Sequence, residues 1–182
     1  MTDVADRYAR LADAFAATVA AVPGERWSSP APCEGWDARA VVAHVVETHE
    51  MFEGLVGRSL GDLPSVGDDP TAAFAAARTA VEAHLRDPQA AGASFEGSLG
   101  QVTFAEVVDR FISFDLLIHR WDLATAAGLD ARLPADEVQR AWEDAHEFPD
   151  GMRSPAVFGP EVPVPGGADL QTRLLGFLGR RG

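Results

Sequence analysis

Apolar residues recur at intervals of three and four through most of the chain, which is the spacing of amphipathic α-helices. Pro23 and Gly24 end the first periodic stretch, Asp37 is a predicted N-cap for the second, and Asp69 with Pro70 opens the third. The three stretches span residues 4–22, 38–56 and 70–85. The pattern therefore predicts an all-α protein.

A fourth long helix is predicted between Thr103 and Gly128. Thr103 and Glu106 form the capping-box pattern S/T-x-x-E, and a glycine is the usual residue after a helix C-terminus. Residues 95–102 form at most a small hairpin or an extended connection. Residues 135–148 and 169–178 are predicted short helices, and 149–167 is rich in proline and glycine. We expect one domain over residues 1–182, a bundle of four long helices with short accessory helices at its C-terminal end.

The composition narrows the function classes. The net charge is -13 and the basic residues form no cluster, which excludes nucleic acid and an anionic membrane surface as partners. No apolar run approaches the ~20 residues needed to cross a bilayer, and the N-terminus lacks the pattern of a secretory signal. The lone Cys33 favours a reducing compartment. We expect a cytoplasmic protein.

Asp115 occupies a position that the apolar pattern of residues 103–128 assigns to the protein interior. Burying a charged carboxylate costs several kcal/mol unless the group is paired, hydrogen-bonded or bound to a metal ion. The sequence contains no lysine, so the partner is either an arginine, such as Arg110 or Arg120, or a metal ion.

Two histidines suit a metal site with this carboxylate. His119 lies four residues after Asp115, hence on the same side of the helix, and His44 lies on the apolar face of helix 38–56. Two histidines and one carboxylate leave coordination positions open for water or substrate, as in catalytic sites. The alternative is that these histidines are hydrogen-bonded core residues. The remaining histidines lie beside charged residues and are predicted on solvated faces: His49, His84 and His146.

Three further residues near these positions have alternative interpretations. Asp122 either orients His119 as a hydrogen-bond acceptor or caps and bridges helices at the surface. Trp121 is predicted to be a core or pocket-wall residue. Cys33 has no base nearby in the sequence and is predicted to be structural rather than nucleophilic.

Three segments together resemble a known family: PCEGWDARAVVAHVV, DLLIHRWDLATAAG and FGPEVPVPGGADLQTRLLGFLGR. They resemble actinobacterial proteins of the DinB-like superfamily, in the group related to the metal-binding N-terminal domain of mycothiol-dependent maleylpyruvate isomerase. The resemblance implies a DinB-like four-helix bundle with a metal held by His44, Asp115 and His119. The acidic ligand in the resembled family is commonly glutamate.

The resemblance also implies an activity. It suggests a metal-dependent thiol transferase or isomerase that uses a low-molecular-weight thiol such as mycothiol on a small electrophile. The implied metal is zinc, with nickel or iron as alternatives. Because two histidines and a carboxylate also describe iron(II) oxygenase sites, a metal hydrolase or non-haem iron enzyme stays open, as does a non-catalytic protein that binds metal or a small molecule.

Overall fold

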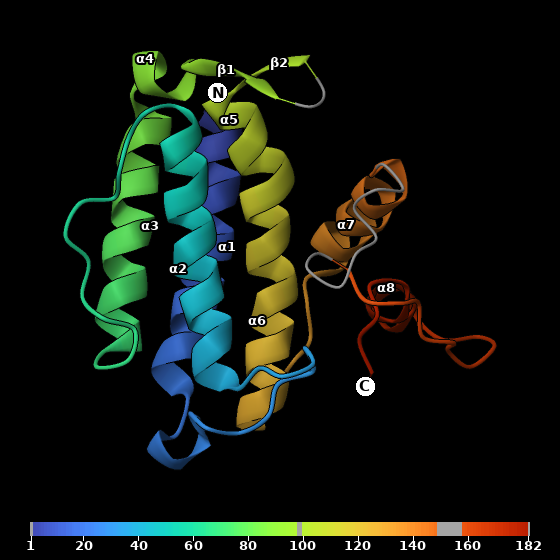
Figure 1. Cartoon of the computed structure of the whole chain (residues 1–182). Coiled ribbons are helices and arrows are strands. Elements are labelled where there is room, and N and C mark those ends of the chain that lie inside the picture. The colour runs from blue at the N-terminus through green and yellow to red at the C-terminus, as the bar shows by residue number, and fades with distance from the viewer. Residues whose placement is uncertain (1, 98–99, 149–157, 182) are drawn as a thin grey trace.

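Four long helices form a bundle in the computed structural model, which describes residues 2–97, 100–148 and 158–181 (Figure 1). They are α1 (Thr2–Ala21), α2 (Ala38–Leu55), α3 (Pro70–Arg86) and a fourth helix made of α5 (Phe104–Val107), a π-helical segment (Val108–Ile112) and α6 (Ser113–Ala127). Both α1 and α2 pack against α3 and against α6, so the four axes form a square. The predicted all-α bundle is confirmed.

The predicted helix ends are set by side-chain caps. Asp37 accepts a hydrogen bond from the backbone N–H of Ala40 at the start of α2, and Asp69 does the same for Ala72 at the start of α3. Thr103 and Glu106 form the capping box that the sequence predicts. Because these side chains satisfy N–H groups that have no partner inside the helix, they fix where each helix begins.

The fourth helix is interrupted where the sequence predicted a continuous one. Residues Val108–Ile112 form a π-helical turn, a feature found mostly inside α-helices near functional sites. Arg7 of α1 holds this turn, because its Nη1 donates to the backbone carbonyl of Asp109 at 2.6 Å and to the carboxylate of Asp109 at 2.9 Å. Arg7 is only 4% exposed, so the contact lies inside the structure.

The remaining elements lie at the two ends of the bundle and beside α6 (Figure 1). A 3₁₀ turn (Gly24–Arg26) follows α1, and α4 (Pro88–Ala91) precedes the antiparallel pair β1 (Ser94–Gly97) and β2 (Gly100–Thr103). Two accessory helices, α7 (Ala135–Glu147) and α8 (Leu170–Phe177), pack together and lie beside α6 (Figure 1). Residues 149–157 of the predicted proline- and glycine-rich segment lie outside the described residues.

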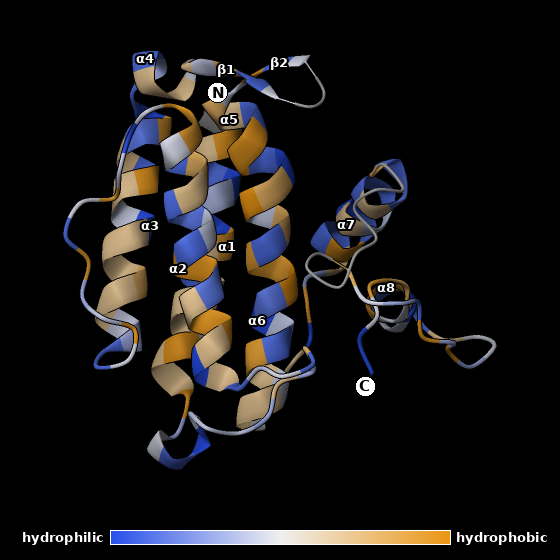
Figure 2. Cartoon of the chain, in the orientation of Figure 1, coloured by the Kyte–Doolittle hydropathy of each residue, from blue (hydrophilic) through white to orange (hydrophobic). Residues whose placement is uncertain are grey.

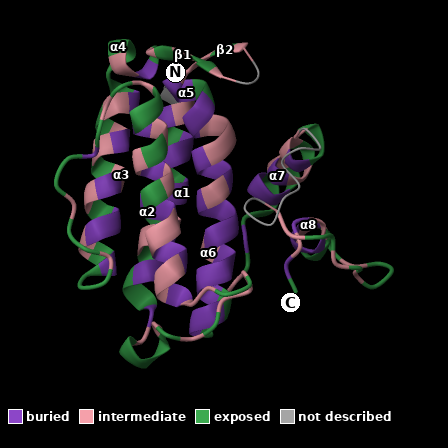
Figure 3. Ribbon diagram, viewed as in Figure 1, coloured by how far each residue is buried: buried purple, intermediate pink, exposed green. Residues whose placement is uncertain are grey.

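The core lies between the four long helices, where their apolar faces meet (Figure 2). Helix α6 is buried around most of its circumference, because α1 and α2 cover one side and the accessory helices lie on the other (Figure 3). The largest fully buried side chains include Tyr8, Phe15, Phe74, Phe104 and Leu116. Within the described ranges, every helix is too short or too polar to cross a membrane.

The prediction that His49 lies on a solvated face is wrong. Its side chain is fully buried, with Nδ1 2.7 Å from the carbonyl of Val45 and Nε2 2.8 Å from the hydroxyl of Tyr8. Its acidic neighbour Glu50 lies on another face of α2, so charge next to it in the sequence was misleading. His84 is also partly shielded, because its Nδ1 lies 2.7 Å from the buried carboxylate of Glu53, whereas His146 is exposed.

Candidate metal centre

Helices α2 and α6 bring together the three residues that the sequence singled out. Nε2 of His44 lies 3.5 Å from Oδ2 of Asp115, and Nε2 of His119 lies 3.2 Å from Oδ1 of the same carboxylate. One potential ligand atom from each of the three residues lies within 4.8 Å of the other two. Asp115 and His119 lie 71 and 75 positions after His44 in the sequence, so it is the bundle fold that places His44 beside them.

These separations suit a single divalent ion. Ligand atoms at about 2.1 Å from a tetrahedral ion are about 3.4 Å from one another, close to the two distances found here. In addition, Oδ2 of Asp115 is shielded from solvent and has no hydrogen-bond partner among the described residues. Because an unsatisfied buried carboxylate oxygen is costly, a cation at this position would satisfy it. The donor set therefore fits a metal ion.

The electrostatics of the site favour a positive charge between its carboxylates. Burial opposes ionisation of Asp115, but the nearby imidazoles of His119 and His44 hold the pKa of Asp115 well below its usual range. Burial likewise opposes protonation of His119, yet Asp115 and Asp122 raise the pKa of His119 well above its usual range. A ligating imidazole must be neutral, so a metal ion that binds Nε2 of His119 competes with a proton for that nitrogen.

Asp122 orients His119, which decides between the two interpretations that the sequence left open. Its side chain is fully buried and its Oδ2 accepts a hydrogen bond from Nδ1 of His119 at 2.9 Å. With Nδ1 donating to Asp122, Nε2 is the nitrogen that faces Asp115 and His44. This is the usual arrangement of a metal-binding histidine and its supporting carboxylate.

Two residues near Asp122 were not assigned to the site from the sequence. The Sγ atom of Cys33 lies 3.4 Å from Oδ2 of Asp122, a carboxylate that is distant from it in the sequence. Arg180, which follows α8, places Nη2 3.1 Å from the same oxygen and 3.7 Å from the sulfur. Both residues are far from Asp122 in the sequence, and no local pattern indicates the contact.

Cys33, His119 and Asp122 form a second group with potential metal-ligand spacing. This group is a poor cation site, because the guanidinium of Arg180 contacts both the sulfur and the carboxylate. The positive charge of this guanidinium would repel a metal ion from the group. The group of His44, Asp115 and His119 is therefore the better metal centre.

The alternative partners of Asp115 are engaged elsewhere. Arg110 packs over the rings of Phe111 and Phe148, and Arg120 donates through Nη1 to the carbonyl of Arg132 at 2.6 Å. Neither arginine forms an ion pair with Asp115 within the described residues. Trp121 is buried in the core, as the sequence predicts.

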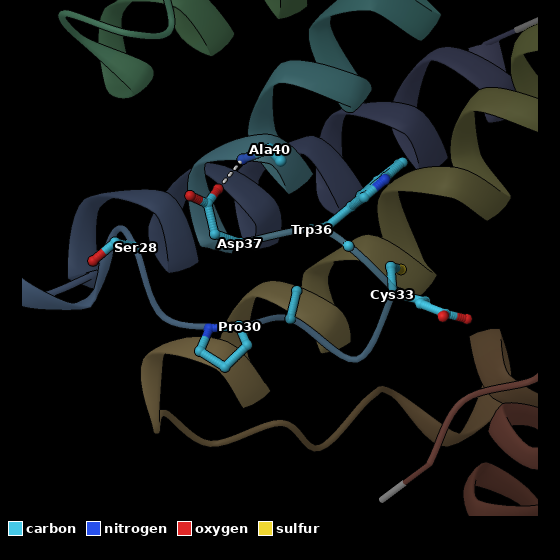
Figure 4. A pocket seen from close by; sticks show the side chains of 9 residues that line it. Ser28, Pro30, Cys33, Trp36, Asp37 and Ala40 are labelled. Carbon is cyan, nitrogen blue, oxygen red and sulfur yellow. Dashed lines mark hydrogen bonds between the residues drawn. The ribbon is translucent and has the colours of Figure 1, made fainter.

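Trp36 connects the metal centre with a surface hollow. Its ring centre lies 4.8 Å from that of His44 and 5.7 Å from that of His119, nearly parallel to the latter. The loop between α1 and α2 that carries Trp36 and Cys33 also forms a hollow of about 440 Å³ (Figure 4). The side chains of His44 and Asp115 are 32% and 22% exposed, so small molecules can reach them from solvent.

Comparison with known proteins gives a family match over most of the bundle. The family model described as "Mycothiol maleylpyruvate isomerase N-terminal domain" matches residues 8–124, which include all three candidate ligands. Two uncharacterized proteins of Mycobacterium tuberculosis, from strains CDC 1551 / Oshkosh and H37Rv, are each 32% identical over 173 residues, covering 94% of this chain and 94% of theirs. No solved structure matches the chain.

Proposed function

Because the chain belongs to the mycothiol maleylpyruvate isomerase N-terminal domain family, we propose that it is a metal-dependent enzyme that transfers a low-molecular-weight thiol to a small electrophile. The observation that carries this proposal is the convergence of His44, Asp115 and His119, with a buried carboxylate oxygen that lacks a hydrogen bond. The side chains of His44 and Asp115 are partly exposed, which an ion pair with a purely structural role does not require. A site that admits both an ion and a substrate requires such an opening.

The proposed ion is zinc, with nickel or iron as alternatives, held by the two imidazoles and the carboxylate. A divalent cation bound there would stabilise a thiolate over the thiol and so supply a nucleophile at neutral pH. His119 is held for this task by Asp122, while the ring of Trp36 packs against both imidazoles. The S–H bond of the thiol would break and its proton would pass to solvent. The sulfur would then form a bond to an electrophilic carbon whose multiple bond opens, and the neighbouring atom of that bond would take up a proton from solvent.

The hollow beside Trp36 is the proposed place for the body of the thiol. Its volume of about 440 Å³ lies within the usual size of small-molecule sites. Ser28, Glu34 and Asp37 line it and provide hydroxyl and carboxylate oxygens that accept hydrogen bonds. These groups suit a thiol that carries hydroxyl or amino groups, such as a thiol of the mycothiol type.

Elemental analysis and thiol titration test the proposal together. Purified protein should contain close to one divalent metal ion per chain, and the metal-loaded form should consume thiol when a reactive electrophile is added. The metal-stripped protein, measured at the same concentration, is the control.

Each other result has a defined meaning. Iron that is retained under aerobic purification, without thiol consumption, would favour a non-haem iron enzyme or a hydrolase. Thiol binding without loss of any electrophile across a broad panel would favour a binding protein. A chain that takes up no divalent metal would overturn the proposal.

A further inference from the structure

Arg180 lies against the metal centre although it belongs to the segment that follows α8. Its Nη2 donates to Oδ2 of Asp122 at 3.1 Å, and its Nε approaches Oδ1 at 3.4 Å. The residue is 9% exposed, and its own backbone is fixed because its N–H donates to the carbonyl of Leu175 at 2.8 Å. Nη1 donates to the carbonyl of Leu178 at 3.1 Å. The guanidinium is therefore held on both sides.

The carboxylate of Asp122 connects Arg180 with His119, one of the proposed metal ligands. A guanidinium that meets both oxygens of a carboxylate fixes its plane as well as its distance. Oδ2 of Asp122 also accepts from Nδ1 of His119 at 2.9 Å. As a result, the orientation of the His119 imidazole depends on where Arg180 holds the carboxylate.

We propose that Arg180 is a positioning residue for the metal centre, and that the segment after α8 is part of the site. Through Asp122 it sets the direction in which Nε2 of His119 points. Arg180 lies outside residues 8–124, which the family model matches, so the family match does not assign it this role. The inference rests on the proposed function in one respect, namely that His119 is a metal ligand.

A positioning role of Arg180 and a purely electrostatic effect of its charge predict opposite changes in metal affinity when Arg180 is replaced. A positive charge near a cation site opposes cation binding, so loss of Arg180 would tighten metal binding if charge were its only effect. If Arg180 orients His119, its loss weakens metal binding, because supporting residues of this kind typically change metal affinity 10–100-fold. Lysine keeps the charge but lacks the planar fork that meets both carboxylate oxygens.

The test compares zinc affinity, measured by competition with a chromophoric chelator, in Arg180→Gln, Arg180→Lys and Arg181→Gln. Arg181 is the adjacent, exposed arginine and serves as the matched control. We expect zinc binding about 10–100-fold weaker in both Arg180 variants and unchanged in Arg181→Gln. Unchanged or tighter binding in Arg180→Gln, or wild-type affinity in Arg180→Lys, would overturn the inference. Since Arg180→Lys keeps a charge opposite Asp122, it provides the measurement if the glutamine variant fails to fold.

A second measurement separates this inference from the proposed function. In the metal-free protein, NMR should show a downfield Nδ1–H resonance for His119 that is protected by Asp122. We expect this resonance to be lost or broadened in Arg180→Gln and retained in Arg181→Gln. If the wild-type protein binds no zinc, the proposed function fails by itself, while a sharp, unshifted resonance in Arg180→Gln overturns the positioning role.

Discussion

Replacing Asp115 with asparagine separates the stability that a metal ion contributes from the stability of the fold. Asparagine has nearly the same shape but is a neutral and weaker ligand. An ion that binds only the folded state adds about 2.7 kcal/mol when its free concentration is a hundred times its dissociation constant. For a chain of 182 residues, the entropy of unfolding is about 0.4 kcal/mol per kelvin, so the melting temperature should rise by about 7 °C.

The assay is thermal unfolding of metal-stripped protein with and without zinc, followed by circular dichroism. We expect the wild-type protein to gain about 7 °C at a zinc concentration a hundred times its dissociation constant and Asp115→Asn to gain far less at that same concentration. Asp13→Asn is a suitable control, because the Asp13 carboxylate is 70% exposed and lies away from the metal centre in an ion pair with Arg78. The reasoning is refuted if zinc raises the melting temperature of wild type and Asp115→Asn equally.

Three further results follow from the structure. Asp115→Glu should keep the metal ion and Asp115→Ala should lose most of it. Thiol consumption should follow metal occupancy across these variants. Thiol transfer that persists in metal-free Asp115→Ala would contradict this mechanism. Burial lowers the pKa of His49 to about 4, so between pH 6.5 and 4 the unfolded chain binds more protons than the folded one. The free energy of unfolding, measured by urea denaturation, should therefore fall by roughly 3 kcal/mol as the pH drops through that window. In His49→Gln the fall should be smaller. Arg7→Met leaves the carboxylates of Asp109 and Glu137 without their shared partner and should cost about 3–5 kcal/mol in the same assay, whereas Arg10→Met, on the exposed face of α1, should change little.

The sequence predicted the helices well because their ends are encoded locally. The caps at Asp37, Asp69 and Thr103 act on backbone groups within three residues, so each can be recognised from neighbouring letters. The same holds for the i, i+4 pair of Asp115 and His119 on one helix. His44 could be added because it interrupts an apolar face, and the structure brings it to Asp115.

Other parts of the site could not be predicted because they depend on contacts between distant segments. Cys33 and Arg180 meet at Asp122 from positions 89 and 58 residues away, and neither lies in a pattern that indicates a buried partner. His49 was misplaced for a related reason. Its buried environment comes from Tyr8 on another helix, whereas its sequence neighbours are polar.

The π-helical turn at Val108–Ile112 changes the direction in which the side chains after it point, compared with a regular α-helix. One inserted residue rotates everything beyond it by about 100° relative to a regular α-helix, since each residue advances the helix by that angle. Deleting one residue there would therefore force a choice between two alignments. Either Phe104 stays in the core at the upper end, or Asp115 stays opposite His44 further along, but a straight helix would not do both. The inserted residue lets the same helix meet a packing requirement at one end and a geometric requirement of the site at the other.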